Sequence, residues 1–436
     1  MKKIVLSAIV LCSACTLQAQ SINKIINTKD VTKIEKVLSA DDMQGRRAFT
    51  PGIVKASFYI ESEFKKIGLQ TFNGAKDFKQ EFSMTESKNV FQKVLIDGKV
   101  IDKDNVVFFS YQPRITMTEK SDLQVVKINA GDEFGPKFYE YYQSDKNLLV
   151  LVDASFKARI QNVKHIPQMT ANPGGNTVVF VFGTTEATQF SIEGANTITK
   201  KALNNVIGVL KGKSKPNEYV VFSGHYDHLG VGSPSEGVEH DATDSIYNGA
   251  NDDAAGTTAV IMLAKYFKKL NNNERTLLFT TFVAEEIGGY GAQYFSKQLD
   301  PAQVIAMFNM EMIGTESKWG KNSAYITGFE KSNMGEILQR NLQGSAFKFY
   351  PDPYPEQQLF YRSDNATLAK LGVPAHTIST SKMDSEPNYH KVSDEIETLD
   401  MINMAQIIKA IAISSSTIIN GKDTPSRVDS SALSRN

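Results

Sequence analysis

The sequence predicts an α/β fold, in which helices flank a mostly parallel central sheet in a three-layer sandwich and a β-rich module is inserted. Three observations support this prediction. From about residue 203 onward, apolar runs of strand length alternate with helical patterns, as in parallel strands joined by crossover helices. The run Leu277 to Ala284 is apolar throughout, as in a strand covered on both faces. From about residue 86 to 200, short β-like runs are instead broken by Gly, Asn, Asp and Pro.

The region before the module is expected to supply helices that dock on the core. Val31 to Leu38 is a short amphipathic pattern. After a turn at Thr50-Pro51-Gly52, the stretch Ile53 to Ile67 places apolar residues at helical spacing, and Gly68 ends it.

The region after the module alternates between strand-like runs and helical patterns. The strand-like runs are Asn205 to Leu210, Tyr219 to Ser223, Leu277 to Ala284, Val304 to Phe308 and Ala375 to Ser379. The helical patterns are Ala254 to Leu270, Ser332 to Leu342 and Asn365 to Leu371. We therefore expect a signal peptide at 1–20, the first part of the main domain at 21–85, the inserted module at 86–200, the main domain at 201–420 and a disordered tail at 421–436.

The N-terminus has the pattern of a secretory signal. Lys2 and Lys3 precede an apolar run from Ile4 to Leu17, and the small residue Ala19 follows at a plausible cleavage point. The run is too short for a comfortable membrane span. We therefore expect export to the periplasm, the cell surface or the medium of a bacterium. A core helix is one alternative, and Ser13-Ala14-Cys15, which resembles a lipoprotein processing site, makes a lipid anchor another.

Composition narrows the chemistry. Both cysteines, Cys12 and Cys15, lie in the signal-like segment, so the rest of the chain can form neither disulfides nor thiolate metal sites. Any metal must be held by histidine and carboxylate. Lys+Arg and Asp+Glu are both 48, so no net charge draws the chain to nucleic acid. No second apolar run approaches transmembrane length.

Histidine and acidic residues follow three of the predicted strands. His225 and Asp227 follow the strand that starts at Tyr219, Glu285 and Glu286 follow the next one, and Glu311 follows the one after. Ligand sites in open α/β sheets form outside the carboxyl ends of the strands. Adjacent residues that leave a strand point in different directions, so one glutamate can bind metal while the other faces substrate as a general base. The sequence therefore predicts a site at this edge of the sheet.

Two more blocks belong with these. Asn251-Asp252-Asp253 opens a predicted helix, where ordinary N-capping would explain one carboxylate. Capping does not explain why the loop Ser245 to Ala250 leads there directly from the His225 block. Tyr389-His390 supplies a late histidine. The other histidines of this region are expected to be structural, and His228 is expected to point away from the site. These structural histidines are His228, His240 and His376.

In the order of these blocks, the chain resembles the M28 family of zinc peptidases, the co-catalytic aminopeptidases. The shared order is H-x-D at 225–227, N-D-D at 251–253, E-E at 285–286, N-x-E-M-x-G at 309–314 and a late histidine. The resemblance covers residues 40–70 and 203–415, including Gly45-Arg46-Arg47. It implies two zinc ions, peptide substrates with a free N-terminus and hydrolysis through a metal-bound water.

The resemblance also implies a role for each residue. One zinc would be held by His225, Asp252 and Glu311, and the other by Asp252, Glu286 and His390, so that Asp252 bridges them. Glu285 would be the general base, Asp227 the partner of His225, and Tyr389 a donor to the tetrahedral oxyanion.

One residue departs from the family pattern. Where the family usually has Asp, this chain has Glu311, whose extra methylene lengthens the reach by roughly 1.5 Å. Zinc–oxygen bonds are about 2.0 to 2.2 Å, so the backbone or the binding mode must adjust.

We expect from these features an exported zinc aminopeptidase. Another M28-type activity (carboxypeptidase, dipeptidase or glutaminyl cyclase) and a non-catalytic peptidase-like binding protein are the alternatives.

Overall fold

The computed structural model describes residues 22–232 and 244–432. The chain forms two compact units, one that ends at Phe82 and resumes at Leu203, and a second from Ser83 to Ala202. The expected signal peptide with its alternative lipid anchor lies outside the described residues, as do His240 and residues 433–436.

The first unit is built on a central, mostly parallel sheet. From one edge inward its strands are β17 (Lys348–Pro351), β16 (Ser323–Ile326), β18 (Ala375–Ser379), β15 (Val304–Met310), β11 (Lys215–His225), β14 (Arg275–Phe282), β10 (Phe190–Leu210) and β2 (Lys79–Ile96). Only the part of β10 from Leu203 onward and the part of β2 up to Phe82 belong to this unit. Strands β18, β15, β11 and β14 run parallel, whereas β16 and β10 are antiparallel to their neighbours β18 and β14. The predicted α/β fold class is confirmed.

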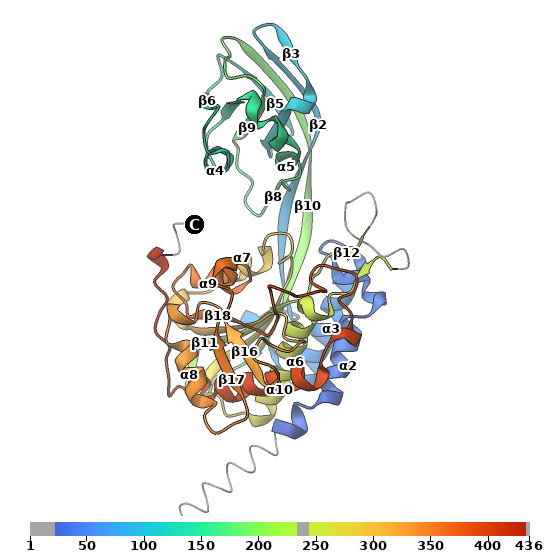
Figure 1. The fold of residues 1–436 in the computed structure, drawn as a ribbon, viewed down its shortest axis with the longest axis vertical. Helices are drawn as coiled ribbons and strands as arrows, with labels where there is room; N and C mark the ends of the chain where they lie inside the picture. Colours follow the sequence, from blue (N-terminus) through green and yellow to red (C-terminus); the bar gives the residue numbers. More distant parts are fainter. Residues whose placement is uncertain (1–21, 233–243, 433–436) are drawn as a thin grey trace, which may run out of the picture. The chain divides into compact units, whose positions relative to one another are not determined.

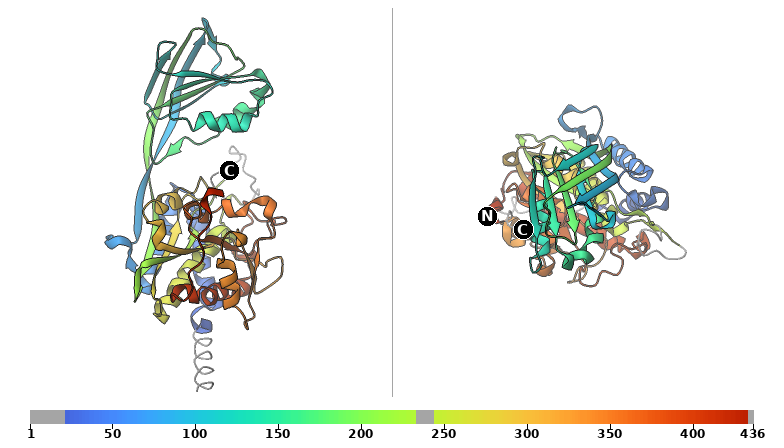
Figure 2. Two further views of the ribbon diagram at one scale, coloured as in Figure 1. Left: turned by 90° about the vertical axis from the view of Figure 1, so that its left-hand side faces the viewer. Right: turned by 90° about the horizontal axis from the view of Figure 1, so that it is seen from above.

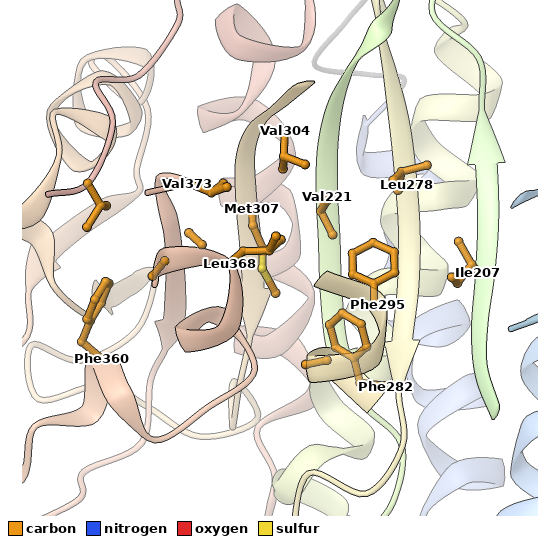
Figure 3. Packing of buried hydrophobic residues seen from close by; sticks show 14 residues of the cluster. Ile207, Val221, Leu278, Phe282, Phe295, Val304, Met307, Phe360, Leu368 and Val373 are labelled. Carbon is orange, nitrogen blue, oxygen red and sulfur yellow. The ribbon is translucent and has the colours of Figure 1, made fainter. Parts of the chain in front are cut away.

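Helices cover both faces of this sheet (Figure 1). On one face Phe222 of β11 stacks between Phe279 and Phe308 of the adjacent strands and against Phe267 of α6 (Ala255–Leu270). On the other face, α7 (Tyr290–Ser296) and α9 (Asn365–Ala369) cover an apolar cluster drawn in Figure 3. Its strand residues include Val221, Leu278 and Met307. Full burial of each such side chain stabilises the folded state by about 1.5 to 3 kcal/mol. This packing holds the strands together and so positions the side chains at their ends.

Three further helices complete the layer over α6. They are α2 (Thr28–Leu38), α3 (Pro51–Ile67) and α10 (Met401–Ser414). The Asn27 side chain caps α2, Gly68 ends α3 with a positive φ of 80°, and the Asp400 carboxylate caps α10. Within the described ranges, no helix combines the length and the apolar character needed to cross a bilayer.

The second unit contains its own sheet, in the order β4 (Val106–Ser110), β9 (Thr177–Phe182), β7 (Leu148–Val152) and β6 (Gln124–Ile128). Alternate residues of these strands belong to two separate apolar clusters, one on each face of the sheet. Helix α4 (Phe134–Tyr142) covers one of them, as Figure 2 shows. The unit therefore has a core of its own.

The expectation of a disordered tail does not hold for residues 421–432. Arg427 Nη1 donates to the carbonyl of Val304 at 2.8 Å, and Val428 is buried in the apolar cluster under α9. Asp423 pairs with Arg340 at 2.6 Å. The segment is polar in composition, but one apolar side chain and a few specific pairs suffice to hold it.

Candidate metal centre

Three parallel strands deliver the predicted side chains to one edge of the sheet. β11 ends at His225, which lies in register with Phe282, the last residue of β14. Glu285 and Glu286 follow shortly after, and Glu311 follows the end of β15 at Met310. A turn over Ala250–Ala254 at the start of α6 supplies two further carboxylates, Asp252 and Asp253.

Asp252 lies between two histidines. Its Oδ1 is 3.2 Å from His225 Nε2, and its Oδ2 is 3.3 Å from His390 Nε2. On the outer sides, Glu311 Oε1 lies 3.2 Å from His225 Nε2, and Glu286 Oε2 lies 3.3 Å from His390 Nε2. The structure therefore brings together all five side chains predicted to bind metal, with Asp252 in the middle.

Glu311 reaches the site despite its extra methylene. Its Oε1 is as close to His225 as the nearer oxygen of Asp252 is, and its Oε2 accepts a hydrogen bond of 2.6 Å from the Ser363 hydroxyl. Ser363 thus fixes the longer side chain in an orientation that faces His225.

Asp227 acts on the site through two different groups. Its backbone carbonyl is 3.1 Å from His225 Nδ1, whereas its carboxylate is 3.9 Å away from that nitrogen. The carboxylate instead accepts the backbone N–H groups of Glu285 at 3.1 Å and Glu286 at 3.4 Å. Burial raises the pKa of Asp227 to about 6, although His225 opposes the rise. Asp227 therefore orients the His225 ring with its main chain and the two glutamates with its side chain.

Asp253 and Asp252, at the start of α6, have different roles. The carboxylate of Asp253 accepts three backbone N–H groups, from His225 at 3.1 Å, Gly256 at 3.0 Å and Met312 at 3.1 Å. Its oxygens also lie within 4.8 Å of ligand atoms of His225 and Glu311. Because these N–H groups already occupy it, Asp253 is an anchor for three segments, and Asp252 is the carboxylate left for a cation.

Asp394 is a residue that the sequence did not reveal. Its two oxygens accept the backbone N–H groups of Asn251 at 2.8 Å and Asp252 at 3.0 Å. It lies in a polar loop, where the sequence gives no sign that this aspartate is buried rather than exposed to solvent.

The prediction that His228 points away from the site is wrong. His228 Nδ1 lies 2.7 Å from Glu286 Oε1, and His228, Asp252 and Glu286 form a second group whose ligand atoms lie within 4.8 Å of one another. The alternation of side chains applies only within a strand, and β11 ends at His225. In the loop that follows, the His228 N–H donates to the carbonyl of Arg46, which turns the ring toward Glu286.

Arg46 is a second unrecognised positioning residue. Its buried guanidinium donates to four backbone carbonyls, those of Leu38, Tyr226, Asn248 and Gly249, at 2.6 to 2.9 Å. The loops that carry His225 and Asp252 are thereby tied to the N-terminal segment.

His376 has the structural role that was expected. It is buried on β18, with Nδ1 2.8 Å from the Thr327 carbonyl and Nε2 2.7 Å from the Ser332 hydroxyl. Burial lowers its pKa to about 4, so the ring is neutral.

A cavity of about 110 Å³ opens over the site. Glu285 and Tyr389 line it beside the metal-binding side chains, as do Tyr325 and Arg362. The Tyr389 ring stacks on that of His390, with centroids 4.0 Å apart. Burial raises the pKa of Glu285 well above its usual value, and the nearby carboxylates of Glu311 and Asp364 add to the rise. The side chain predicted to be the general base thus faces the space where a substrate would lie.

The donor set fits zinc. Zinc in proteins is bound by imidazole nitrogen and carboxylate oxygen, and here ring nitrogens and carboxylates face one another at little over 3 Å. Although burial opposes the charge, the hydrogen bonds from His225 and His390 hold the pKa of Asp252 well below its usual range. A charged carboxylate between two rings is suited to bridging two cations.

Comparison with known proteins supports this interpretation. Residues 205–414 match the model of peptidase family M28. This segment belongs to family M28. It contains every predicted site residue, from His225 to His390.

Individual relatives of the M28 segment point the same way. The chain is similar to a probable leucine aminopeptidase of Trichophyton verrucosum, with 27% identity over 47% of this chain and 54% of the relative. It is 28% identical to aminopeptidase YwaD of Bacillus subtilis over 68% of this chain and 62% of that protein. The chain thus spans roughly half to two thirds of the length of these relatives.

A solved structure shows the same fold. The aminopeptidase from Aneurinibacillus sp. strain AM-1 matches with a TM-score of 0.53 and 18% identity, over 92% of this chain and 95% of that one.

Proposed function

We propose that this chain is an exported zinc aminopeptidase that removes N-terminal residues from peptides. One observation carries the proposal: Asp252 faces His225 with one oxygen and His390 with the other, and each histidine has a further carboxylate beside it. Similarity to leucine aminopeptidases and to aminopeptidase YwaD supports the substrate class.

Two zinc ions would share this set. His225, Asp252 and Glu311 would hold one, and Asp252, Glu286 and His390 the other, with His228 hydrogen-bonded to Glu286. Bound zinc supplies a Lewis acid that polarises the peptide carbonyl and makes water a stronger nucleophile.

The chain's own residues would perform the proton transfers and the positioning. Glu285 takes a proton from the attacking water and returns it to the leaving amine, and its position is fixed because its N–H binds Asp227. Tyr389 donates its hydroxyl proton as a hydrogen bond to the oxyanion that develops on the peptide carbonyl. The carboxylate-lined wall of the cavity suits the free ammonium group of a peptide N-terminus.

Glu285→Gln tests the mechanism. The variant should keep its zinc, because Glu285 is not in the ligand set, and lose roughly 10²- to 10⁴-fold in kcat. Hydrolysis of aminoacyl fluorogenic amides and zinc content are measured on the same sample. Glu356→Gln, an exposed glutamate outside the cavity, is the matched control and should retain full activity.

Substrate blocking tests the aminopeptidase assignment. N-acetylated peptides should be cleaved far more slowly than the same peptides with a free N-terminus. Equal rates would sink the aminopeptidase proposal, and retained activity of Glu285→Gln would remove Glu285 from the mechanism.

A further inference from the structure

One wall of the cavity differs from the others in charge. Among the described residues that line it, Arg362 is the only lysine or arginine, whereas Asp252, Glu285, Glu286 and Glu311 all contribute carboxylates. The cavity therefore has an acidic floor at the proposed metal site and one permanent cation at its rim.

The guanidinium of Arg362 has no strong partner. Within the described part of the chain, it forms no ion pair, and its one hydrogen bond joins Nη1 to Gln357 Oε1 at 3.4 Å. An arginine fork prefers a carboxylate, which it can bind through two parallel hydrogen bonds. The side chain is exposed to the cavity and free to make such a pair.

The backbone around Arg362 is fixed relative to the site. Its N–H donates to the carbonyl of Leu359 at 3.2 Å. The next residue, Ser363, donates its hydroxyl proton to Glu311 at 2.6 Å. Arg362 is thus held beside a predicted metal ligand, while its side chain is left uncommitted.

We propose that Arg362 binds a carboxylate of the substrate, so that the site prefers peptides with a negative charge close to the scissile bond. This inference rests on the proposed peptidase function and names its substrate class. The carboxylate has two sources with the same chemistry: an acidic side chain on the first residue, or the terminal carboxylate of a dipeptide.

Two pairs of peptides separate the sources, with the full zinc-loaded chain as the enzyme. Leu-Gly against Leu-Gly-amide varies the terminal carboxylate, and Glu-Gly-amide against Gln-Gly-amide varies the side chain. We expect kcat/KM to favour the charged member of at least one pair by about tenfold or more, as for a charge-assisted hydrogen bond. In Arg362→Gln that preference should fall below about threefold, with neutral peptides changed less than about threefold.

Lys370→Gln is the matched control, since Lys370 is exposed and does not line the cavity. It should keep the wild-type preference. Equal kcat/KM within both pairs for the wild type, or an equal loss on charged and neutral peptides in Arg362→Gln, overturns the assignment of Arg362.

Equilibrium binding keeps this test independent of turnover. If no peptide is hydrolysed, the proposed function fails, and calorimetric binding of the same four peptides then decides the role of Arg362. A charged peptide that binds about tenfold tighter than its neutral partner, and loses this advantage in Arg362→Gln, supports the proposal. Equal affinities within both pairs refute it.

Discussion

Replacing Arg46 by methionine should destabilise the first unit and weaken the metal site together. Methionine keeps an unbranched apolar stem but has no donor, so the carbonyls of Leu38, Tyr226, Asn248 and Gly249 lose their four hydrogen bonds. Since Arg46 is fully buried, water cannot replace the donor without opening the structure.

The size of the effect follows from this geometry. A buried polar group that loses its partner costs about 1 to 3 kcal/mol, and hydrogen bonds from charged donors lie in the upper part of that range. Four carbonyls at the lower bound give about 4 kcal/mol of unfolding free energy. Arg46→Lys keeps the charge but not the fork, so its loss should be smaller.

The chain offers a probe confined to the first unit. Trp319 is the one tryptophan of the sequence and stacks on Tyr350 at 4.0 Å, so its fluorescence in urea reports this unit alone. Lys65→Met, at an exposed position of α3, is the control and should change the free energy of unfolding by no more than about 0.5 kcal/mol. A loss below about 1 kcal/mol in Arg46→Met, with an unchanged urea slope, would refute the reasoning.

Three further predictions concern pH and metal. The pKa of His376 is about 4 in the folded chain and 6.5 as a free side chain, so its stabilising contribution is complete above pH 6.5 and is lost as the pH falls through 4. Urea titrations should therefore show the wild type losing about 3 kcal/mol more than His376→Gln between these pH values, and equal losses would contradict this. Asp394→Ala should lower zinc affinity roughly 10- to 100-fold in a chelator competition, because the backbone at Asp252 loses its anchor; unchanged affinity would show that the anchor does not matter. Zinc at 100 times its dissociation constant should raise the unfolding free energy by about 2.7 kcal/mol per ion, and calorimetry of Asp252→Asn should show a much smaller gain.

The parts of the site that were predictable are those with a local signal. His225 and Glu311 come at or directly after the ends of buried strands, and an apolar run that ends in a charged residue is visible in the sequence alone. The central strands and α6 were predictable for the same reason. The edge strand β17 and its neighbour β16 were not, because each has only 4 residues and neither is a continuous apolar run.

The parts that were missed depend on contacts between distant segments. Arg46 lies 180 residues from Tyr226, and Asp394 lies 142 residues from Asp252. Each satisfies backbone groups, which every residue type presents alike, so no side-chain pattern marks the partner. The orientation of His228 was missed because it depends on a loop held by the carbonyl of Arg46 rather than on strand alternation.

The missed residues show how the site can bury so many carboxylates. Asp227, Asp253 and Asp394 each have their oxygens occupied by backbone N–H groups, so their charges serve as anchors for loops. Asp252 has histidine rings on both sides instead, and Arg46 is a buried cation whose electrostatic interactions include Asp227, Asp252 and Asp394. Zinc and Arg46 therefore compensate the same cluster of negative charge. Loss of Arg46 should therefore have two opposite effects on zinc binding. It removes the hydrogen bonds that position the backbone near Asp252, which lowers the affinity for zinc. It also removes a positive charge beside the carboxylates, which makes zinc binding electrostatically more favourable. Because buried carboxylates without a nearby cation cost several kcal/mol, zinc should stabilise Arg46→Met more than Arg46→Lys, since lysine retains a positive charge that already compensates part of the cluster.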